Sequence, residues 1–221
     1  MNNSSNESEP IPVVPISGGP ALYLIYLIPV KLLIGILNFI FNGYIIWLVI
    51  FCIRKKTYSN LLFFFNAIAD FTTGLVSIPS MTVFTTIGYW PLGKIPCLIW
   101  VINDFSVVSI GAYTLLIIAI HRYQQITRPL KTTEKMTNTK WAVIAGQWLV
   151  TNAFWAISAV IISNSDEFIP EYCYFTYTFA YVFTADFVFY IFPVVGVFVV
   201  NSMVFGQLLK KKRKQNRIGV Q

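Results

Sequence analysis

Two charged residues, Asp104 and Arg122, stand near opposite ends of one long apolar segment. Their separation of 18 residues amounts to roughly five helical turns, or about 27 Å, so both residues lie on the same face of a helix. Ionisable groups at membrane depth are costly and usually functional. A carboxylate can bind an ammonium group through a charge-assisted hydrogen bond, and neighbouring aromatic rings add cation–π attraction. The spacing therefore predicts a cation-binding acid near one end of the segment and a basic contact residue near the other.

The composition indicates that most of the chain has lipid as its solvent. Of the 221 residues, 56% are hydrophobic, 17% are aromatic and only 11% are charged. A soluble domain typically has about 25% charged residues. The net charge of +7 arises from short basic runs between apolar segments, which does not favour nucleic acid as a partner and is typical of an integral membrane protein.

Five apolar segments are long enough to cross about 30 Å of hydrocarbon, which takes roughly 20 helical residues. Continuous apolar runs favour helices over barrel strands, which alternate in polarity. The sequence therefore predicts an all-α integral membrane protein with five transmembrane helices. The first segment is too long for the core of a signal peptide, so we expect it to stay in the protein as a transmembrane helix and not to be cleaved. The predicted helices cover about residues 22–53, 59–85, 97–124, 140–163 and 177–209, between a polar tail over 1–21 and a basic tail over 210–221.

The basic residues predict the orientation in the plasma membrane. Thirteen of the 16 Lys and Arg residues lie on one side of the predicted helices. The positive-inside rule then puts the C-terminus in the cytoplasm and the N-terminus outside. Glycosylation sequons in the N-terminal tail, at Asn2, Asn3 and Asn6, fit the outer side. Cys97 and Cys173 lie on the same outer side, where the oxidising environment permits a disulfide.

Enzyme and transporter classes find little support in the sequence. The chain has one histidine, His121, directly before Arg122. We find no Ser-His-Asp arrangement, no metal-ligand spacing and no cofactor motif. No inverted repeat or broken helix marks a transport site. We therefore expect no metal and no cofactor.

Several motifs follow one another along the chain, and Arg122 lies 25 residues after Cys97. They are Asn42 before GYIIWLVI; NLLFFFNAIADFTTGLVSIPS with Asp70 and Pro79; YWPLGKIPCLIW with Trp90, Gly93 and Cys97; HRYQQITRPL; Trp148 in GQWLVTNAFWA; Cys173; and Pro193 in FYIFP. In this order and at these spacings they resemble the motifs of rhodopsin-like (class A) G-protein-coupled receptors of the aminergic branch. The resemblance covers essentially the whole chain and is closest to muscarinic acetylcholine and histamine receptors.

The resemblance implies a cell-surface receptor for a small cationic amine that signals through a heterotrimeric G protein. Asp104 would bind the ligand ammonium, with Ser109, Tyr190 and Asp186 also facing the ligand. Asp186 is one position away from Ala185, where a histamine-type acid would align, and about 100° of helical rotation separates these neighbours. The alternative for Asp186 is a group that faces the outer headgroups.

The remaining roles also follow from the resemblance. Arg122, His121 and Tyr123 would contact the G protein, and Cys97 and Cys173 would form the outer disulfide. The structural core would contain Asn42, Asp70, Trp148 and Pro193.

Four features depart from the family pattern. His121 replaces the motif's acid, so either Arg122 is less restrained and basal activity is higher, or another group restrains it, or the sequence has drifted. Gly111 stands where a hydroxyl normally serves a sodium site near Asp70, and Asn201 replaces a tyrosine of the fifth helix. The chain also stops after the fifth of seven helices. It is therefore expected to be a fragment, a truncated gene model or a short isoform.

The alternative function is that of a non-signalling receptor that associates with a full-length partner in a dimer.

Overall fold

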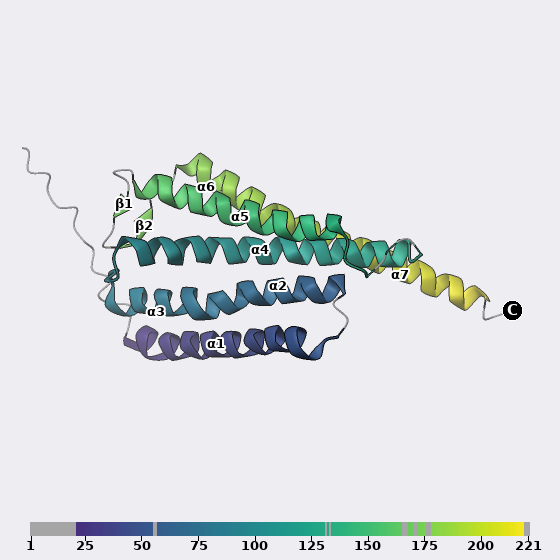
Figure 1. Ribbon diagram of the computed structural model, residues 1–221, viewed down its shortest axis with the longest axis horizontal. Helices are drawn as coiled ribbons and strands as arrows, with labels where there is room; N and C mark the ends of the chain where they lie inside the picture. Colours follow the sequence, from purple (N-terminus) through teal and green to yellow (C-terminus); the bar gives the residue numbers. More distant parts are fainter. Residues whose placement is uncertain are drawn as a thin grey trace, which may run out of the picture.

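Five helical runs pass up and down alongside one another (Figure 1). The computed structural model describes residues 21–54, 57–130, 132, 134–164, 168–169, 172–175 and 178–218. Each run is long and apolar enough to cross a membrane, which confirms the predicted five-helix architecture. The runs are α1 (Ala21–Trp47) with the π-helical turn η1 (Leu48–Cys52); α2 (Tyr58–Thr72), η2 (Thr73–Ser77) and α3 (Ile78–Ile87); α4 (Lys94–Thr127); α5 (Asn138–Ser163); and α6 (Phe179–Asp186), η3 (Phe187–Ile191) and α7 (Phe192–Ile218).

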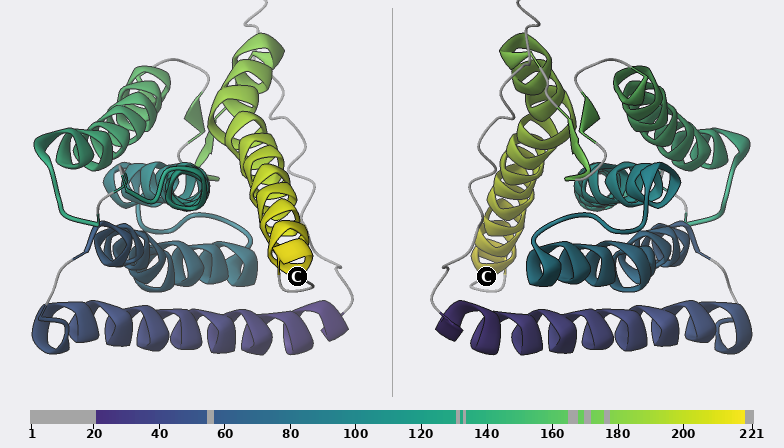
Figure 2. Two further views of the ribbon diagram at one scale, coloured as in Figure 1. Left: turned by 90° about the vertical axis from the view of Figure 1, so that its right-hand side faces the viewer. Right: turned by 90° about the vertical axis from the view of Figure 1, so that its left-hand side faces the viewer.

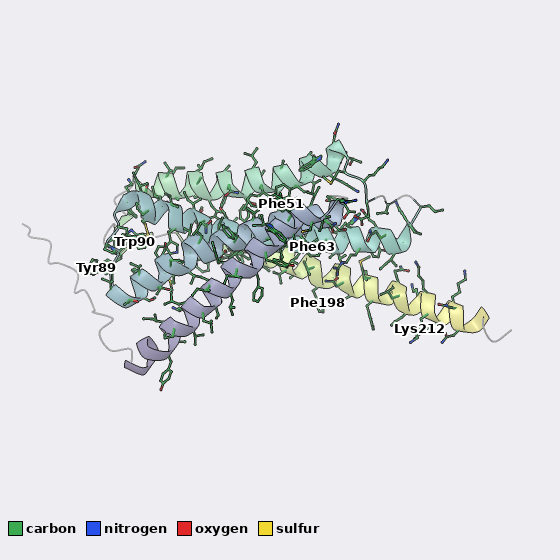
Figure 3. All side chains as sticks on the ribbon, turned by 60° about the horizontal axis from the view of Figure 1, so that its bottom comes forward. Phe51, Phe63, Tyr89, Trp90, Phe198 and Lys212 are labelled. Atoms are coloured by element: carbon green, nitrogen blue, oxygen red, sulfur yellow. A yellow bond between two sulfur atoms is a disulfide. The ribbon has the colours of Figure 1, made fainter. Side chains whose placement is uncertain are left out.

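Some helices extend beyond their predicted limits. The third run begins at Lys94 and ends at Thr127, and the last continues through the basic residues to Ile218 instead of ending near 209. Lys, Arg and Gln are good helix formers, and the basic stretch contains no proline or glycine to stop the helix before Gly219. The basic tail is therefore largely the end of α7, with Lys212 far from the other helices (Figure 3).

Two of the π-helical turns come just before prolines. η2 ends two residues before Pro79, and η3 ends two residues before the fully buried Pro193. Proline has no N–H to donate, and its ring clashes with the carbonyl four residues earlier. The wider π turn is one way in which a helix accommodates this interruption. The turn also changes which side chains of the second run face α4.

A short hairpin and a disulfide close one end of the bundle. Strands β1 (Phe168–Ile169) and β2 (Tyr174–Phe175) are antiparallel, and Cys173 between them bonds to Cys97 near the start of α4. The predicted disulfide is thereby confirmed. Trp90 packs against both cysteines and donates a 2.8 Å hydrogen bond from Nε1 to the Gly93 carbonyl. We call this the disulfide end, and the opposite end, where α4 stops at Thr127, the basic end.

Helix α4 lies at the centre of the arrangement. It contacts α2, α5 and α7, whereas α1 packs along α2 and α3 (Figure 2). Small polar residues are buried on α4, among them Ser106, Ser109 and Thr114, as is typical of helices that pack closely inside a membrane. Large apolar side chains such as Phe51, Phe63 and Phe198 are exposed instead (Figure 3). An apolar exterior over helical spans suits a hydrocarbon solvent.

Candidate functional sites

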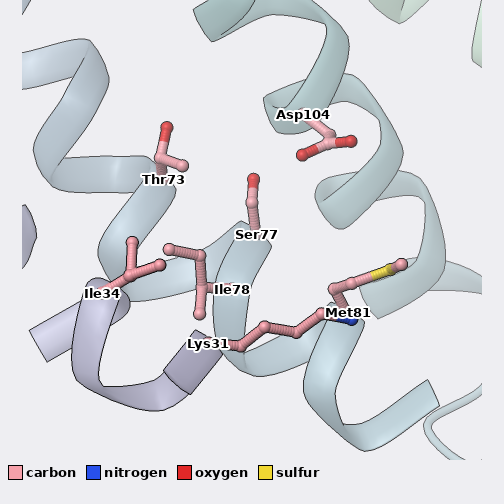
Figure 4. A pocket seen from close by; sticks show the side chains of 7 residues that line it. All are labelled: Lys31, Ile34, Thr73, Ser77, Ile78, Met81 and Asp104. Carbon is pink, nitrogen blue, oxygen red and sulfur yellow. The ribbon is translucent and has the colours of Figure 1, made fainter. Parts of the chain in front are cut away.

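A cavity of about 280 Å³ opens between the first three helical runs (Figure 4). Asp104 faces it from the third turn of α4, and Lys31 faces it from α1. No nitrogen–oxygen distance within 4.0 Å makes these two an ion pair. One acid and one base therefore face the same space without neutralising each other directly. The other lining residues are the hydroxyl-bearing Thr73 and Ser77 and the apolar Ile34, Ile78 and Met81.

Ser77 orients the polar side of this cavity. Its buried hydroxyl accepts a 2.9 Å hydrogen bond from Asn103 Nδ2, and it lies beside the Asp104 carboxylate. Because the Asn103 amide occupies a lone pair of Ser77 Oγ, the hydroxyl proton is available for Asp104. The sequence motif identified Asp104 but gave no indication of Ser77, which depends on the π turn η2 to face α4.

Ser109 and Tyr190 lie on another side of α4 and do not line this cavity. Ser109 is fully buried and donates a 2.8 Å hydrogen bond to the Phe105 carbonyl, to which Tyr190 Oη also donates at 3.3 Å. Trp155 Nε1 donates to Ser109 Oγ at 3.2 Å, and the Trp155 ring stacks on Phe105 at 4.7 Å between ring centroids. Two of the four expected ligand residues thus belong to a tight polar and aromatic contact between α4, α5 and the last run.

Asp186 is the fourth expected ligand residue and lies outside the cavity as well. It is exposed at the end of α6, whereas the preceding Ala185 is buried against Trp155 and Phe189. The rotation of about 100° between adjacent helical residues explains why only one of these neighbours faces inward. The inward position therefore carries a methyl group and not a carboxylate.

Two of the expected core residues, Asn42 and Asp70, belong to one group of hydrogen bonds on the first two helical runs. Asn38, which the sequence motifs had not singled out, donates from Nδ2 to the Asp70 backbone oxygen at 2.6 Å. Asn42 donates to Asn38 Oδ1 at 2.8 Å, and Asn66 donates to Asp70 Oδ2 at 2.7 Å. A Cβ placed on Gly111 would lie 3.7 Å from Asn66 Oδ1, which is ordinary contact distance.

Trp148 and its neighbour Gln147 hold α5 against the rest of the bundle. The Trp148 ring packs on Phe65 with 6.0 Å between the ring centroids. Gln147 Nε2 donates to the Ile110 carbonyl at 2.7 Å and to Thr114 Oγ1 at 2.9 Å. Gln147 was missed in the sequence because a polar residue beside a tryptophan has no distinguishing pattern.

At the basic end, Arg122 and His121 have opposite environments. Arg122 is exposed, and within the described part of the chain it forms no salt bridge. His121 is only 4% exposed, and its Nε2 lies 3.0 Å from Glu134 Oε1. Tyr123 is half-buried. The acid that the motif lacks at 121 is therefore supplied by Glu134 in the following loop, but to the histidine and not to the arginine.

Burial and hydrogen bonding act in opposite directions on the pKa of the Glu134 carboxyl. Partial burial opposes its charge, but hydrogen bonds from His121 and from Ser59 outweigh this effect and hold the pKa of the Glu134 carboxyl below its usual value. Glu134 is thus an ionised carboxylate near neutral pH. This role could not be predicted from the sequence, because the contact joins a loop to two helices.

Comparison with known proteins decides the family. The family model described as "7 transmembrane receptor (rhodopsin family)" matches residues 41–218, well over half of the chain. The chain belongs to this family. Its members are receptors and not enzymes. Together with the five membrane-spanning helices, family membership shows a multi-pass plasma membrane protein with the helical bundle of this family.

The curated relatives to which the chain is similar include muscarinic acetylcholine receptors. The chain is 40% identical over 108 residues to muscarinic acetylcholine receptor DM1 of Drosophila melanogaster, a match that covers 49% of this chain and 13% of the relative. It is 39% identical over 103 residues to muscarinic acetylcholine receptor M2 of Gallus gallus, over 46% of this chain and 22% of the relative. It is 32% identical over 143 residues to muscarinic acetylcholine receptor M3 of Gallus gallus, over 63% and 22% respectively. The matches thus span less than a quarter of these relatives' lengths.

Three expected glycosylation sites, Asn2, Asn3 and Asn6, lie outside the described residues. The same is true of several loop charges that predicted the orientation, namely Lys55, Lys56, Lys131, Asp166, Glu167 and Glu171.

Proposed function

We propose that the protein acts as a cell-surface receptor for a small cationic amine of the acetylcholine type and couples to a heterotrimeric G protein. The observation that carries the proposal is Asp104, which is the acid among the residues lining a cavity of about 280 Å³ near the disulfide end. The muscarinic relatives support the same ligand class.

The lining of the cavity fits such a ligand. Asp104 provides a carboxylate for an ammonium head, and Ile34, Ile78 and Met81 provide apolar contacts for methyl groups. The volume of about 280 Å³ lies just below the roughly 300–1,000 Å³ range of small-molecule sites. A ligand of few heavy atoms is therefore favoured over a long one.

Lys31 adds a second requirement to the ligand. Its charge faces the same cavity as Asp104, so it repels a cation that has no acceptor group at its other end. An ester or another oxygen acceptor at that end would accept a hydrogen bond from the ammonium of Lys31. Acetylcholine combines both groups in one small molecule.

Histamine is less well supported as the ligand. In the family, a fifth-helix polar group would meet the imidazole, but Asp186 is exposed and Ala185 occupies the inward position. Asp104 and Asp186 are both exposed, but only Asp104 lines the cavity, so Asp186 is not placed to meet a ligand bound there.

The orientation proposed is an outer N-terminus and a cytoplasmic C-terminus. Exposed cations gather at the basic end, among them Arg54, Arg128 and Lys210 to Lys214, and the positive-inside rule favours the cytoplasm for that end. Arg122, His121 and Tyr123 would then lie at the G-protein side, with the Cys97–Cys173 disulfide and the sequons outside.

Radioligand binding to membranes from cells that express the whole gene product containing this chain tests the proposal. The wild-type protein should bind labelled acetylcholine in competition with unlabelled acetylcholine, and Asp104→Asn should abolish most of this binding. The matched control is Asp186→Asn, which removes an acid that does not line the cavity and should leave the affinity unchanged. If wild-type membranes bind neither acetylcholine nor histamine, or if Asp104→Asn binds as wild type does, the amine-receptor proposal is wrong.

A further inference from the structure

We propose that Glu134 is a positioning residue that, together with His121, pins the loop between α4 and α5 to the start of α2 and so sets how this loop meets the cytoplasmic partner. The group consists of Ser59, His121, Gln125 and Glu134, and we call it the clasp. The inference about coupling rests on the proposed function, whereas the pinning of the loop does not.

The Glu134 side chain joins two turns of α4 to the loop. His121 Nε2 lies 3.0 Å from Oε1, and Gln125 Nε2 donates to the same oxygen. His121 and Gln125 are four residues apart and therefore lie on one face of the helix. A carboxylate that meets both side chains holds the loop along that face.

The same carboxylate reaches the first turn of α2. Ser59 Oγ donates at 3.1 Å to Oε1, and the Ser59 N–H donates at 3.3 Å to Oε2. The Tyr58 N–H donates at 2.9 Å to the Glu134 backbone oxygen. The first N–H groups of a helix have no partner within the helix and favour a negative charge nearby. Glu134 therefore stabilises the start of α2 while it holds the end of α4.

Burial makes His121 dependent on this partner. Its ring is 4% exposed and meets the Tyr58 ring edge-on, with 4.9 Å between centroids. On α5, Lys140 Nζ lies 4.6 Å from the centroid of the same Tyr58 ring. A buried polar group that loses its hydrogen-bond partner is costly, so removal of Glu134 should displace the loop and not simply leave a gap.

The clasp holds the loop but leaves Arg122 unrestrained, so these two roles are separate in this protein. Exposed Arg122 forms no salt bridge among the residues that the structure describes, so the clasp does not restrain it. Breaking the clasp should then loosen the loop without releasing the arginine. We therefore expect weaker agonist-driven coupling and no rise in basal activity.

Spin-label mobility tests the pinning without any ligand or G protein. A label at Thr132→Cys reports on the loop, a label at Gln124→Cys reports on exposed α4, and Cys52→Ser removes the exposed free thiol. Glu134→Ala should mobilise the loop label and leave the helix label unchanged. His121→Glu places a second carboxylate against Glu134, and its repulsion should have the same effect on both labels. Combining His121→Glu with Glu134→His should immobilise the loop label again. If the loop label stays immobile in Glu134→Ala, or if the exchanged pair is as mobile as the single variants, the clasp is refuted.

Where Glu134→Ala does not reach the cell surface, Ser59→Ala gives a milder test, because it removes the hydroxyl donor but keeps the His121–Glu134 contact. It should raise loop mobility by a smaller amount, and no change relative to wild type would count against the α2 side of the clasp.

Nucleotide exchange on a heterotrimeric G protein tests the coupling role. In membranes with equal surface expression, Glu134→Ala should reduce acetylcholine-stimulated exchange several-fold, with unchanged basal exchange and unchanged acetylcholine affinity. The exchanged pair should recover part of the response. A rise in basal exchange would show that the pair restrains Arg122 and would overturn the inference about coupling. If wild-type protein stimulates no exchange at all, the proposed function fails, and the label measurement still decides whether the clasp exists.

Discussion

Lys31 and Asp104 face one cavity from α1 and α4, but no ion pair joins them. Opposite charges that share a cavity without contact leave each other's hydrogen-bonding groups free for a ligand. Under the proposed function, this arrangement favours a ligand that is cationic at one end and carries an acceptor at the other.

Replacement of Lys31 with methionine should change ligand preference and not abolish binding. Methionine keeps much of the length and apolar volume of lysine but removes the charge. Affinity for tetramethylammonium, which has no acceptor, should rise because repulsion is lost, and affinity for acetylcholine should fall relative to it. Competition binding on membranes measures both, and an unchanged ratio of the two affinities would contradict a shared site.

A close approach between α1 and η2 depends on Gly74. A Cβ at this position would lie 3.0 Å from the Gly35 backbone oxygen and 3.0 Å from the Phe39 backbone nitrogen. Because backbone atoms cannot move aside without separating the two helices, we expect Gly74→Ala to destabilise the protein by about 1–3 kcal/mol. The measurement is thermal unfolding in detergent. Gly146→Ala is the control, since nothing lies within 4 Å of a Cβ there, and it should be neutral or slightly stabilising; equal effects of both would argue against this contact.

The hydrogen bonds of Gln147 should stabilise the contact between α5 and α4. Thr114 is fully buried, and its Oγ1 accepts a hydrogen bond from Gln147 Nε2. Gln147→Ala removes this donor. Interhelical hydrogen bonds within membranes are worth about 0.6 kcal/mol on average and at most about 1.7 kcal/mol, so a loss in this range is expected in chemical unfolding. Asn152→Ala is a matched control, because Asn152 donates only within its own helix, to the Trp148 carbonyl. A larger loss for Asn152→Ala than for Gln147→Ala would show that the cross-helix bonds contribute little.

The low pKa of Glu134 predicts a dependence of stability on pH. Hydrogen bonds from His121 and Ser59 favour the ionised form in the folded protein. The carboxylate therefore adds stability above its ordinary pKa of about 4.3 in the unfolded chain, and this gain is lost as the pH falls through the lower folded value. Unfolding temperatures of wild type and Glu134→Gln should differ near neutral pH and converge on acidification. A difference that grows as the pH is lowered would contradict this assignment.

The sequence allowed the architecture to be predicted because lipid imposes a simple pattern. Long apolar runs between basic loops reveal five spans without any tertiary information. The disulfide was predictable because Cys97 and Cys173 both lie on the predicted outer side and match the cysteine positions of the family. Helix ends were less accurate, because the good helix formers after Leu209 continue α7 beyond its apolar part.

The sites could be predicted only in part. Asp104 and His121 were found from motif positions, but their partners Ser77 and Glu134 were not. Ser77 depends on the rotation introduced by a π turn, and Glu134 reaches His121 from a loop 13 residues later. Asp186 illustrates the converse case, because a shift of one residue moves a side chain from inside the bundle to its exposed face.

Whether Asp104 binds the ligand ammonium is tested by comparing a charged ligand with its neutral isostere on the wild-type receptor and on Asp104→Asn. Acetylcholine and 3,3-dimethylbutyl acetate have nearly the same shape, but only the first has an ammonium. Removing one partner of a desolvated charge pair typically costs ~2–5 kcal/mol of affinity. In competition binding, Asp104→Asn should therefore weaken acetylcholine by roughly 30- to 4,000-fold and leave the neutral ester almost unchanged. If Asp104→Asn weakens both ligands equally, or neither, then Asp104 does not bind the ammonium.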